Sequence, residues 1–413
     1  MNVFFYLNVK FVSFINRLYL LRVMKKVLAA SWHTGSTKSI LPVVKKLREE
    51  SKVDLVLMAH DNSESIYEKE SVDYNVVSDY GLNDVSLDSM KRIVGEESPD
   101  VVLTGGGCQD PKTKDVIEQT LTLAAKEYDI PSVSVRDNWK HNLVFFNDTT
   151  LPEDEGRFRF LSTYVTAIDE RHKEILVEQG FPADGLVVTG NPSSDHLGSL
   201  RDNFTEEDSD RVRNDLGIGL DSWFVLYASQ PFRKYEHGNA GAPDFFGFNE
   251  DTLLTDFVEG ISKFDCPGFE VLVKAHPFES KEHLEWMVRE RLGKNYPVVG
   301  GREYDTMQAI SASDLVVSSV SNILVEATYL DKLAVSLQPG LMRNDGTLRR
   351  DDILITNEFG ITPHTYTKDG VLSVIDKVMC DPDYKVELAE KRKEFSKGIG
   401  SATDKVCDFI YGL

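Results

Sequence analysis

The residues with the clearest chemical potential form a serine-rich turn near residue 320. The turn contains Ser318, Ser319, Ser321 and Asn322. A helix is expected directly after it, over Ile323–Leu330. The first turn of a helix has N–H groups without partners and the positive end of the helix dipole, so hydroxyls there favour a bound phosphate. Glu326, about one turn later, could accept hydrogen bonds from a ribose diol. An ordinary N-capped helix is the other interpretation of these residues.

Two further polar segments follow strands expected in the same half of the chain. Lys274 and His276 come after an apolar run at 269–273. Ligands of open α/β sheets bind at the carboxyl ends of the strands, so His276 is a candidate for phosphate binding and catalysis, and Lys274 for charge. The other segment follows 223–227 and contains Ser229, Gln230 and Arg233. Its basic residues favour a diphosphate contact. A structural histidine and a solvated loop are the alternatives.

The first half of the chain has a polar glycine turn after its first expected strand. Gly35 and Ser36 in this turn are candidate substrate-binding residues. The turn lacks the G-x-G-x-x-G pattern of a dinucleotide site and the G-K-[ST] of a P-loop. A second glycine-rich segment, Thr104–Gly107, would allow a ligand to approach the backbone closely, although a plain flexible turn explains it equally well.

Carboxylates that could act as a general base occur at two places in the first half. Glu153 and Asp154 belong to an acidic run at 152–155, and Asp137 follows a strand expected at 132–135. A base of this kind would accept the proton of an attacking hydroxyl. An acidic run is equally typical of a solvated surface.

These residues must be positioned by an alternation of strands and helices that starts at Met24. Strands are predicted at 27–30, 53–58, 101–103, 132–135, 164–167 and 186–188, and again at 223–227, 269–273, 298–299, 315–317 and 333–337. Such alternation predicts parallel sheets covered on both faces. A charged segment at 203–213 interrupts it. We therefore predict an α/β protein with two Rossmann-like domains, 24–202 and 203–413, that face each other across a cleft, with helices at the C-terminus.

Composition narrows the classes of partner. The 413-residue chain has a net charge of −21, which disfavours nucleic acid as a partner. Cys108, Cys266, Cys380 and Cys407 have no metal-ligand spacing and are typical of reduced thiols in a cytoplasmic protein. Residues 1–23 are aromatic and apolar but interrupted by charges, which argues against a membrane span. No small-residue cleavage site follows them, which argues against a signal peptide. We favour a translation start at Met24; an interfacial anchor stays open.

The order of these segments resembles the glycosyltransferase-B superfamily, and within it the non-hydrolysing UDP-N-acetylglucosamine 2-epimerases. P-E-D-E-G-R at 152–157 is similar to the family's P-E-E-x-N-R, and T-G-N-P-S-S-D at 189–195 to T-G-N-x-x-x-D. Glu326 falls on the last glutamate of D-S-G-G-x-x-E-E-A, which binds ribose in that family, and His276 falls near the family's diphosphate-binding histidine. The resemblance covers most of 24–381. It implies a glycosyltransferase-B fold with the nucleotide bound by the C-terminal half.

The chain departs from the epimerase pattern at its catalytic acids. The aspartate of the family's G-D-T falls on Gly105–Gly107, the glutamate of E-A-G-L-R falls on Arg136, and D-S-G-G has become S-V-S-N at 319–322. The His-Pro pair with serines also resembles bacterial sialyl- and polysialyltransferases and the glycerophosphotransferases of wall polymers. We therefore expect a nucleotide-sugar-dependent glycosyltransferase of surface polysaccharide or glycan biosynthesis. A UDP-N-acetylglucosamine 2-epimerase-like enzyme and a non-catalytic nucleotide-sugar-binding protein are the alternatives.

This interpretation needs no metal and no cofactor, because the basic residues and the helix N-terminus could stabilise a leaving diphosphate. The expected partners are a nucleotide-diphosphate sugar and a glycan or lipid-linked acceptor. The expected location is the cytoplasm, with peripheral contact to the inner face of the membrane as a further option. The sugar, the base and the oligomeric state are left open.

Overall fold

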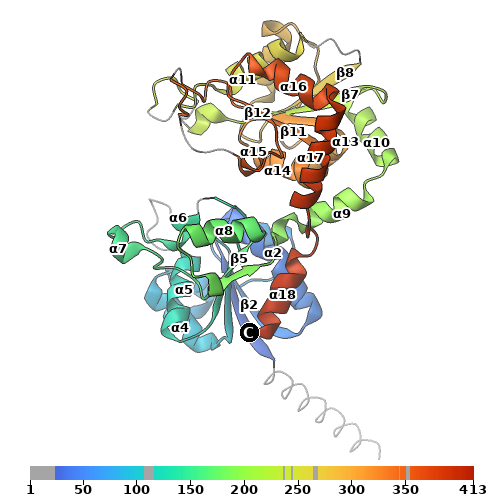
Figure 1. The fold of residues 1–413 in the computed structure, drawn as a ribbon. Coiled ribbons are helices and arrows are strands. Elements are labelled where there is room, and N and C mark those ends of the chain that lie inside the picture. Colours follow the sequence, from blue (N-terminus) through green and yellow to red (C-terminus); the bar gives the residue numbers. More distant parts are fainter. Residues whose placement is uncertain are drawn as a thin grey trace, which may run out of the picture. The chain divides into compact units, whose positions relative to one another are not determined.

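The computed structural model describes residues 24–106, 116–140, 142–235, 238–242, 245–263, 268–343, 345–349 and 354–413. The predictions for residues 1–23, Gly107, Cys108 and Cys266 lie outside these ranges. The chain divides into two compact units, each described by itself below (Figure 1). Unit 1 comprises Met1–Asp195 and Gly398–Leu413, and unit 2 is the continuous segment His196–Lys397.

Unit 1 is built on a six-stranded parallel sheet with the order β2-β1-β3-β4-β5-β6. Its strands are β1 (Lys25–Ser31), β2 (Val53–Ala59), β3 (Val101–Thr104), β4 (Ser132–Ser134), β5 (Tyr164–Ala167) and β6 (Leu186–Val188). The central strands β3 and β4 are buried, as expected for a parallel sheet with helices on both faces.

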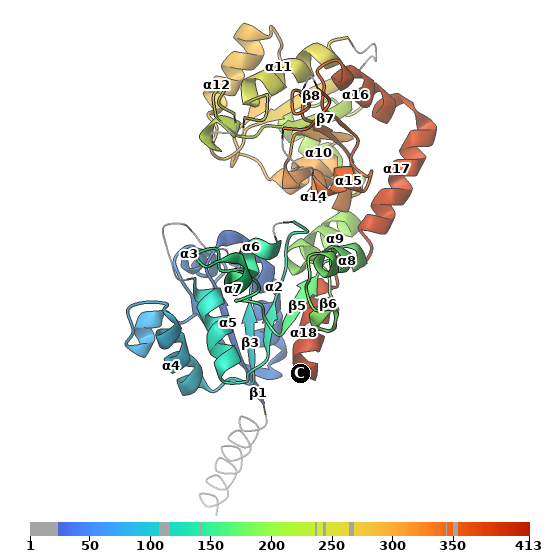
Figure 2. The same cartoon turned by 60° about the vertical axis from the view of Figure 1, so that its left-hand side comes forward.

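Helices cover both faces of this first sheet. One face packs against α2 (Thr34–Glu50), α3 (Asn62–Lys69) and the C-terminal helix α18 (Ala402–Gly412), through side chains such as Val43, Leu47 and Ile410. The opposite face packs against α4 (Leu87–Glu97) and α5 (Ile117–Glu127), through Ile93 and Leu121. Figure 2 shows α5 and α18 on opposite sides of the strands.

Unit 2 repeats the architecture with a second parallel sheet, in the order β12-β11-β10-β7-β8-β9. The strands are β7 (Trp223–Ala228), β8 (Phe269–Lys274), β9 (Val298–Val299), β10 (Leu315–Ser318), β11 (Leu333–Leu337) and β12 (His364–Thr365). Side chains alternate between the two faces. Val225 and Tyr227 of β7 belong to the largest apolar cluster, together with side chains of α11 (Glu250–Ile261) and α16 (Gly370–Cys380). On the other face α13 (Thr306–Ala312) contacts β7 and α10 (Glu206–Leu216).

The remaining helices are shorter or lie at the edges of the two units. They are α6 (Asn142–Phe146), α7 (Glu153–Gly156), α8 (Glu170–Glu178), α9 (Asp195–Asn203), α12 (Lys281–Trp286) with a π-helical continuation (Met287–Arg291), α14 (Asn322–Tyr329), α15 (Ile355–Glu358) and α17 (Pro382–Phe395). Short 3-10 turns cover Val77–Tyr80, Ala183–Gly185, Pro192–Ser194 and Phe232–Tyr235. Among the described helices, none is long and apolar enough to cross a membrane.

The predicted strands agree with the observed ones to within two residues at each end. The interruption predicted at 203–213 is instead mostly helical. Residues 203–213 lie largely within α10, whose N-terminus is closed by a reciprocal capping box between Thr205 and Asp208. This cap and the buried Val212 and Leu216 stabilise a helix whose composition is weakly apolar. The chain passes between the units after Asp195 and again after Lys397, and α18 packs with unit 1 rather than with the C-terminal helices of unit 2.

Candidate functional site

The carboxyl edge of the second sheet gathers polar residues from four adjacent strands. Gln338 follows β11, Ser319 follows β10, Gln230 follows β7 and His276 follows β8. Because these strands are parallel neighbours, their ends meet at one edge of the sheet. Ligands of open α/β sheets bind at this edge.

The turn between β10 and α14 leads into an N-capped helix. Ser321 is the N-cap of α14, and its Oγ accepts a hydrogen bond from the Ile323 amide at 3.4 Å. Asn322 is exposed at the first helical position, and Glu326 is half-buried one turn later. Ser318 is different, because its hydroxyl donates to the Ala228 carbonyl at 2.8 Å and so joins the ends of β10 and β7.

Three buried polar atoms at this edge make no hydrogen bond within the described part of the chain. They are Ser319 Oγ, Gln230 Oε1 and Gln338 Oε1. Ser319 has no exposed surface, and Gln338 is 1 % exposed. Buried polar groups are normally hydrogen-bonded. These three oxygen atoms are therefore not used by hydrogen bonds within the described part of the protein.

His276 is held as a neutral ring. Its Nδ1 accepts a hydrogen bond from the Phe278 amide at 3.2 Å, so the ring proton of the neutral form lies on Nε2. Burial lowers the pKa of His276, and the nearby Lys234 ammonium lowers it further. At neutral pH His276 is thus a hydrogen-bond donor through Nε2 rather than a cation.

Lys274, also predicted for this site, makes hydrogen bonds within unit 2 instead. Its ammonium donates to the carbonyls of Gly301 at 3.2 Å and Tyr304 at 3.3 Å, and the residue is only 4 % exposed. Burial lowers its pKa. The lysine thereby ties the loop after β9 to the end of β8.

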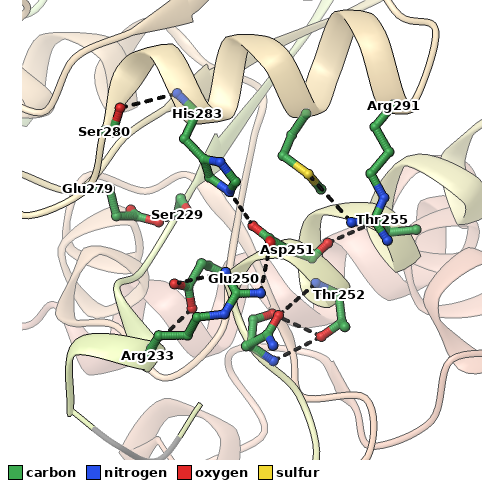
Figure 3. Close-up of polar contacts among 12 residues, drawn as sticks. Ser229, Arg233, Glu250, Asp251, Thr252, Thr255, Glu279, Ser280, His283 and Arg291 are labelled. Carbon is green, nitrogen blue, oxygen red and sulfur yellow. Dashed lines mark hydrogen bonds and ion pairs between the residues drawn. The ribbon is translucent and has the colours of Figure 1, made fainter. Parts of the chain in front are cut away.

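Arg233 is likewise engaged by the protein itself. Its guanidinium lies 2.7 Å from Asp251 Oδ2 and 3.5 Å from Glu250 Oε1, at the start of α11 (Figure 3). The other oxygen of Asp251 lies 2.8 Å from His283 Nε2. Burial alone would raise the pKa of Asp251, but the hydrogen bonds from Arg233 and His283 hold it below its usual range. Two carboxylates therefore offset the charge that the sequence suggested for a diphosphate.

Glu279 was not selected from the sequence, yet it bonds residues that follow β7 and β8 at this edge. It accepts hydrogen bonds from Ser229 Oγ at 2.7 Å and from the His276 amide at 2.8 Å. Burial raises its pKa to about 7 in spite of these bonds, and the nearby Glu250 and Asp251 raise it further. Nothing in the local sequence distinguishes it from the neighbouring Glu282 or Glu285.

The carboxyl edge of the first sheet forms a second polar region. Asp137, after β4, lies over Gly35 at the start of α2, and an added Cβ at Gly35 would lie 3.1 Å from Asp137 Oδ2. Ser36 donates through its hydroxyl to Glu118 Oε1 at 2.8 Å. The structure therefore brings together three of the predicted residues, Gly35, Ser36 and Asp137.

Glu118 on α5 is a buried carboxyl group that the sequence did not reveal. It is 2 % exposed, and its Oε1 also accepts the Trp32 amide at 2.8 Å. Burial raises its pKa to about 7. It therefore holds together the end of β1 and the start of α2.

The glycines between these groups are sterically required. A side chain at Gly105 would collide with Ser36, and one at Gly106 would collide with the Arg136 guanidinium. Arg136 is fully buried, and its guanidinium lies 3.9 Å from the centroid of the Phe145 ring. At Gly105 and Gly106 there is thus no room for a carboxylate-bearing side chain.

Glu153 and Asp154, the other predicted bases, lie elsewhere in unit 1. Both are exposed in the first turn of the four-residue helix α7. No hydrogen bond that the structure records joins either of them to Asp137, Gly35 or Ser36. Their position fits acidic residues that complement a helix N-terminus.

Comparison with known families decides the class of the protein. The sequence matches the CDP-glycerol:poly(glycerophosphate) glycerophosphotransferase family over residues 152–412, which is more than half of the chain. The chain belongs to this family. Membership confirms the prediction of a transferase with a nucleotide-linked donor. The more specific prediction, that the donor carries a sugar, stays a prediction. No curated protein matches the sequence.

Solved structures establish the fold. The UDP-GlcNAc 2-epimerase of Neisseria meningitidis, bound to UDP-GlcNAc, is 16% identical, with a TM-score of 0.66 over 94% of this chain and 100% of its own. The Methanocaldococcus jannaschii UDP-GlcNAc 2-epimerase is 18% identical, with a TM-score of 0.61 and the same coverage. Anabaena HepE in complex with UDP is 12% identical, with a TM-score of 0.57 over 94% of this chain and 100% of its own. The family member thus has the glycosyltransferase-B fold, as the sequence predicted.

Proposed function

We propose that the chain transfers glycerol phosphate, or a closely related polyol phosphate, from a CDP-linked donor to a hydroxyl group of a surface polymer. The observation that carries this proposal is the family match, which spans all of unit 2. In this reaction the acceptor oxygen attacks the phosphorus that bears the glycerol. The bond from that phosphorus to the bridging oxygen breaks, CMP leaves, and the hydroxyl proton passes to a base.

The donor is assigned to the carboxyl edge of the second sheet. Ser319, Ser321 and the exposed amides at the start of α14 are the proposed ligands of the diphosphate. The neutral His276 would donate from Nε2 to a phosphate oxygen and so stabilise charge on the leaving CMP. Glu326 would accept the ribose hydroxyls. Among the predicted bases we favour Asp137, because it is half-buried beside Gly35, whereas Glu153 and Asp154 are exposed on α7.

The nucleotide-sugar glycosyltransferase expected from the sequence would use the same edge but release a nucleoside diphosphate. The predicted cytoplasmic location, with peripheral contact to a membrane-borne acceptor, suits either donor. The chemical identity of the released nucleotide therefore separates the two reactions.

The test is product analysis with a panel of donors and a glycerophosphate polymer as acceptor. We expect CMP from CDP-glycerol, in amounts that depend on the acceptor. Ser321→Ala should lower turnover by roughly 10-fold or more, because a hydrogen bond to a charged group contributes about 1.5–3 kcal/mol. Ser280→Ala is the matched control, since Ser280 is the N-cap serine of α12 in the same unit.

Release of a nucleoside diphosphate from a nucleotide sugar, with no CMP from CDP-glycerol, would replace this proposal with the glycosyltransferase. Epimerisation of UDP-N-acetylglucosamine at C2 would favour the epimerase-like alternative. Tight binding without turnover would identify a binding protein.

A further inference from the structure

Glu279 makes three hydrogen bonds that join the ends of two strands at the proposed donor site. Its own amide donates to the His276 carbonyl at 2.9 Å. Its carboxyl group accepts the His276 amide at 2.8 Å and the Ser229 hydroxyl at 2.7 Å. Residues 276 and 279 are thus bonded reciprocally, and the turn between them is tied to the neighbouring strand end.

This turn fixes the proton of the His276 ring. The Phe278 amide, which makes Nδ1 an acceptor at 3.2 Å, lies inside the loop that Glu279 closes. The hydrogen bond at one ring nitrogen determines which nitrogen carries the proton. A change in the 276–279 turn would move the Phe278 amide and free the ring to exchange its proton between the two nitrogens.

Several charged groups surround the Glu279 carboxyl group. Glu250 and Asp251 face it from α11, and both oppose its ionisation. The Arg233 guanidinium offsets the charge of Asp251, and His283 Nε2 lies 2.8 Å from the other Asp251 oxygen (Figure 3). Burial raises the pKa of Tyr227 on β7, and the nearby Glu279 carboxylate raises it further. Burial and the two neighbouring acids, Glu250 and Asp251, thus disfavour the charged form of Glu279.

We propose that Glu279 is a positioning residue of the donor site. It holds the neutral His276 ring in the tautomer protonated at Nε2, and it fixes the position of Ser229 relative to His276. This inference rests on the proposed function for its role in turnover. The tautomer itself is a property of the chain without donor, so it can be measured separately.

Two substitutions separate the effect of the Glu279 hydrogen bonds from the effect of its side-chain size. Glu279→Gln keeps an oxygen for the His276 amide and an NH2 group that can donate to Ser229 Oγ. Glu279→Met keeps the length of the side chain but removes both side-chain hydrogen bonds. Glu282→Gln is the matched control, because Glu282 is an exposed glutamate three residues further along.

The measurement is the 15N spectrum of histidine-labelled protein at neutral pH. The signals of His276 among the nine histidines are identified by their loss in His276→Gln. We expect the Nε2-protonated pattern in wild type, in Glu279→Gln and in Glu282→Gln, and an average of both tautomers in Glu279→Met. The kcat for CDP-glycerol should fall at least 10-fold in Glu279→Met and stay within about 2-fold of wild type in Glu279→Gln.

An unchanged tautomer in a folded Glu279→Met protein would overturn the proposal, whatever its turnover. Tautomer averaging in Glu279→Gln would equally overturn it, since the amide preserves the hydrogen bonds. If wild type releases no CMP, the proposed function fails, but the tautomer experiment still decides the role of Glu279.

Discussion

At the scale of single residues, the notable groups are two carboxyl groups held in buried sites. Glu118 in unit 1 and Glu279 in unit 2 each have a pKa raised to about 7, chiefly because burial disfavours the charged form. Each also links the ends of two elements at the carboxyl edge of its sheet. Neither has a sequence signature, because burial and hydrogen-bond partners arise only on folding. The same reason explains why the engagement of Lys274 and Arg233 by the protein could not be predicted.

The raised pKa of Glu118 predicts a measurable dependence of stability on pH. A carboxyl group with a pKa of 4.5 when unfolded and about 7 when folded binds more protons in the folded state between these values. Its stabilising effect is therefore complete below about pH 4.5 and is lost as the pH rises through 7. Glu118→Gln removes this dependence. The free energy of unfolding of the variant, relative to wild type, should rise by about 3 kcal/mol between about pH 4.5 and pH 8.

Urea denaturation across this pH range measures the effect. Glu127→Gln is the control on the same helix, because the Glu127 side chain is 50% exposed. We expect its free-energy difference from wild type to change over this pH range far less than that of Glu118→Gln. A flat profile for Glu118→Gln as well would mean that Glu118 titrates normally in the folded protein.

At the scale of elements, the sequence predicted what depends on local pattern. The bounds of β5, β6, β9 and β11 agree with the predicted strands, because short apolar runs between turns determine them. The turn before α14 was also placed correctly. The partner of the last helix was not predictable, since an amphipathic helix can cover any apolar face. Contacts between residues more than 200 positions apart in the sequence decide it, and no local pattern reports them.

One such contact is a long-range cap of α18. Asp195 Oδ1 accepts the amides of Gly400 at 3.0 Å and Ala402 at 3.1 Å, and Oδ2 accepts the Thr403 amide at 2.7 Å. A carboxylate that binds three amides at a helix start satisfies groups that the helix leaves unpaired. It also complements the helix dipole. Asp195 thus joins the two crossings of the chain between the units.

We predict that Asp195→Ala lowers the free energy of unfolding of unit 1 by roughly 1–2 kcal/mol, the usual contribution of a cap. Hydrogen exchange should accelerate at the amides of α18 and stay unchanged in the second sheet. Asp202→Ala serves as the control, because the Asp202 side chain on α9 is 65% exposed and pairs only with the adjacent Arg201 among the recorded ion pairs. Equal effects of the two substitutions would show that the cap contributes nothing specific.

At the scale of the whole molecule, unit 2 is a continuous segment inserted into unit 1. It has its own sheet and its own apolar cluster, from Val225 to Leu388. Its two ends lie close together, because the Asp195 carboxylate bonds directly to the Gly400 amide. Domains with these properties commonly fold alone. The proposed donor residues, from Ser229 to Glu326, also lie entirely within this segment.

We therefore predict that a fragment of residues 196–397 folds independently and binds CMP with an affinity within about 10-fold of the full chain, or about 1.4 kcal/mol. The physical reason is that the core and every proposed nucleotide contact remain intact. Circular dichroism on heating and isothermal calorimetry measure the two properties. Glu326→Ala in the same fragment should weaken binding of CMP, because the half-buried carboxylate is assigned to the ribose. A folded fragment that binds no CMP, while the full chain does, would place essential nucleotide contacts in unit 1.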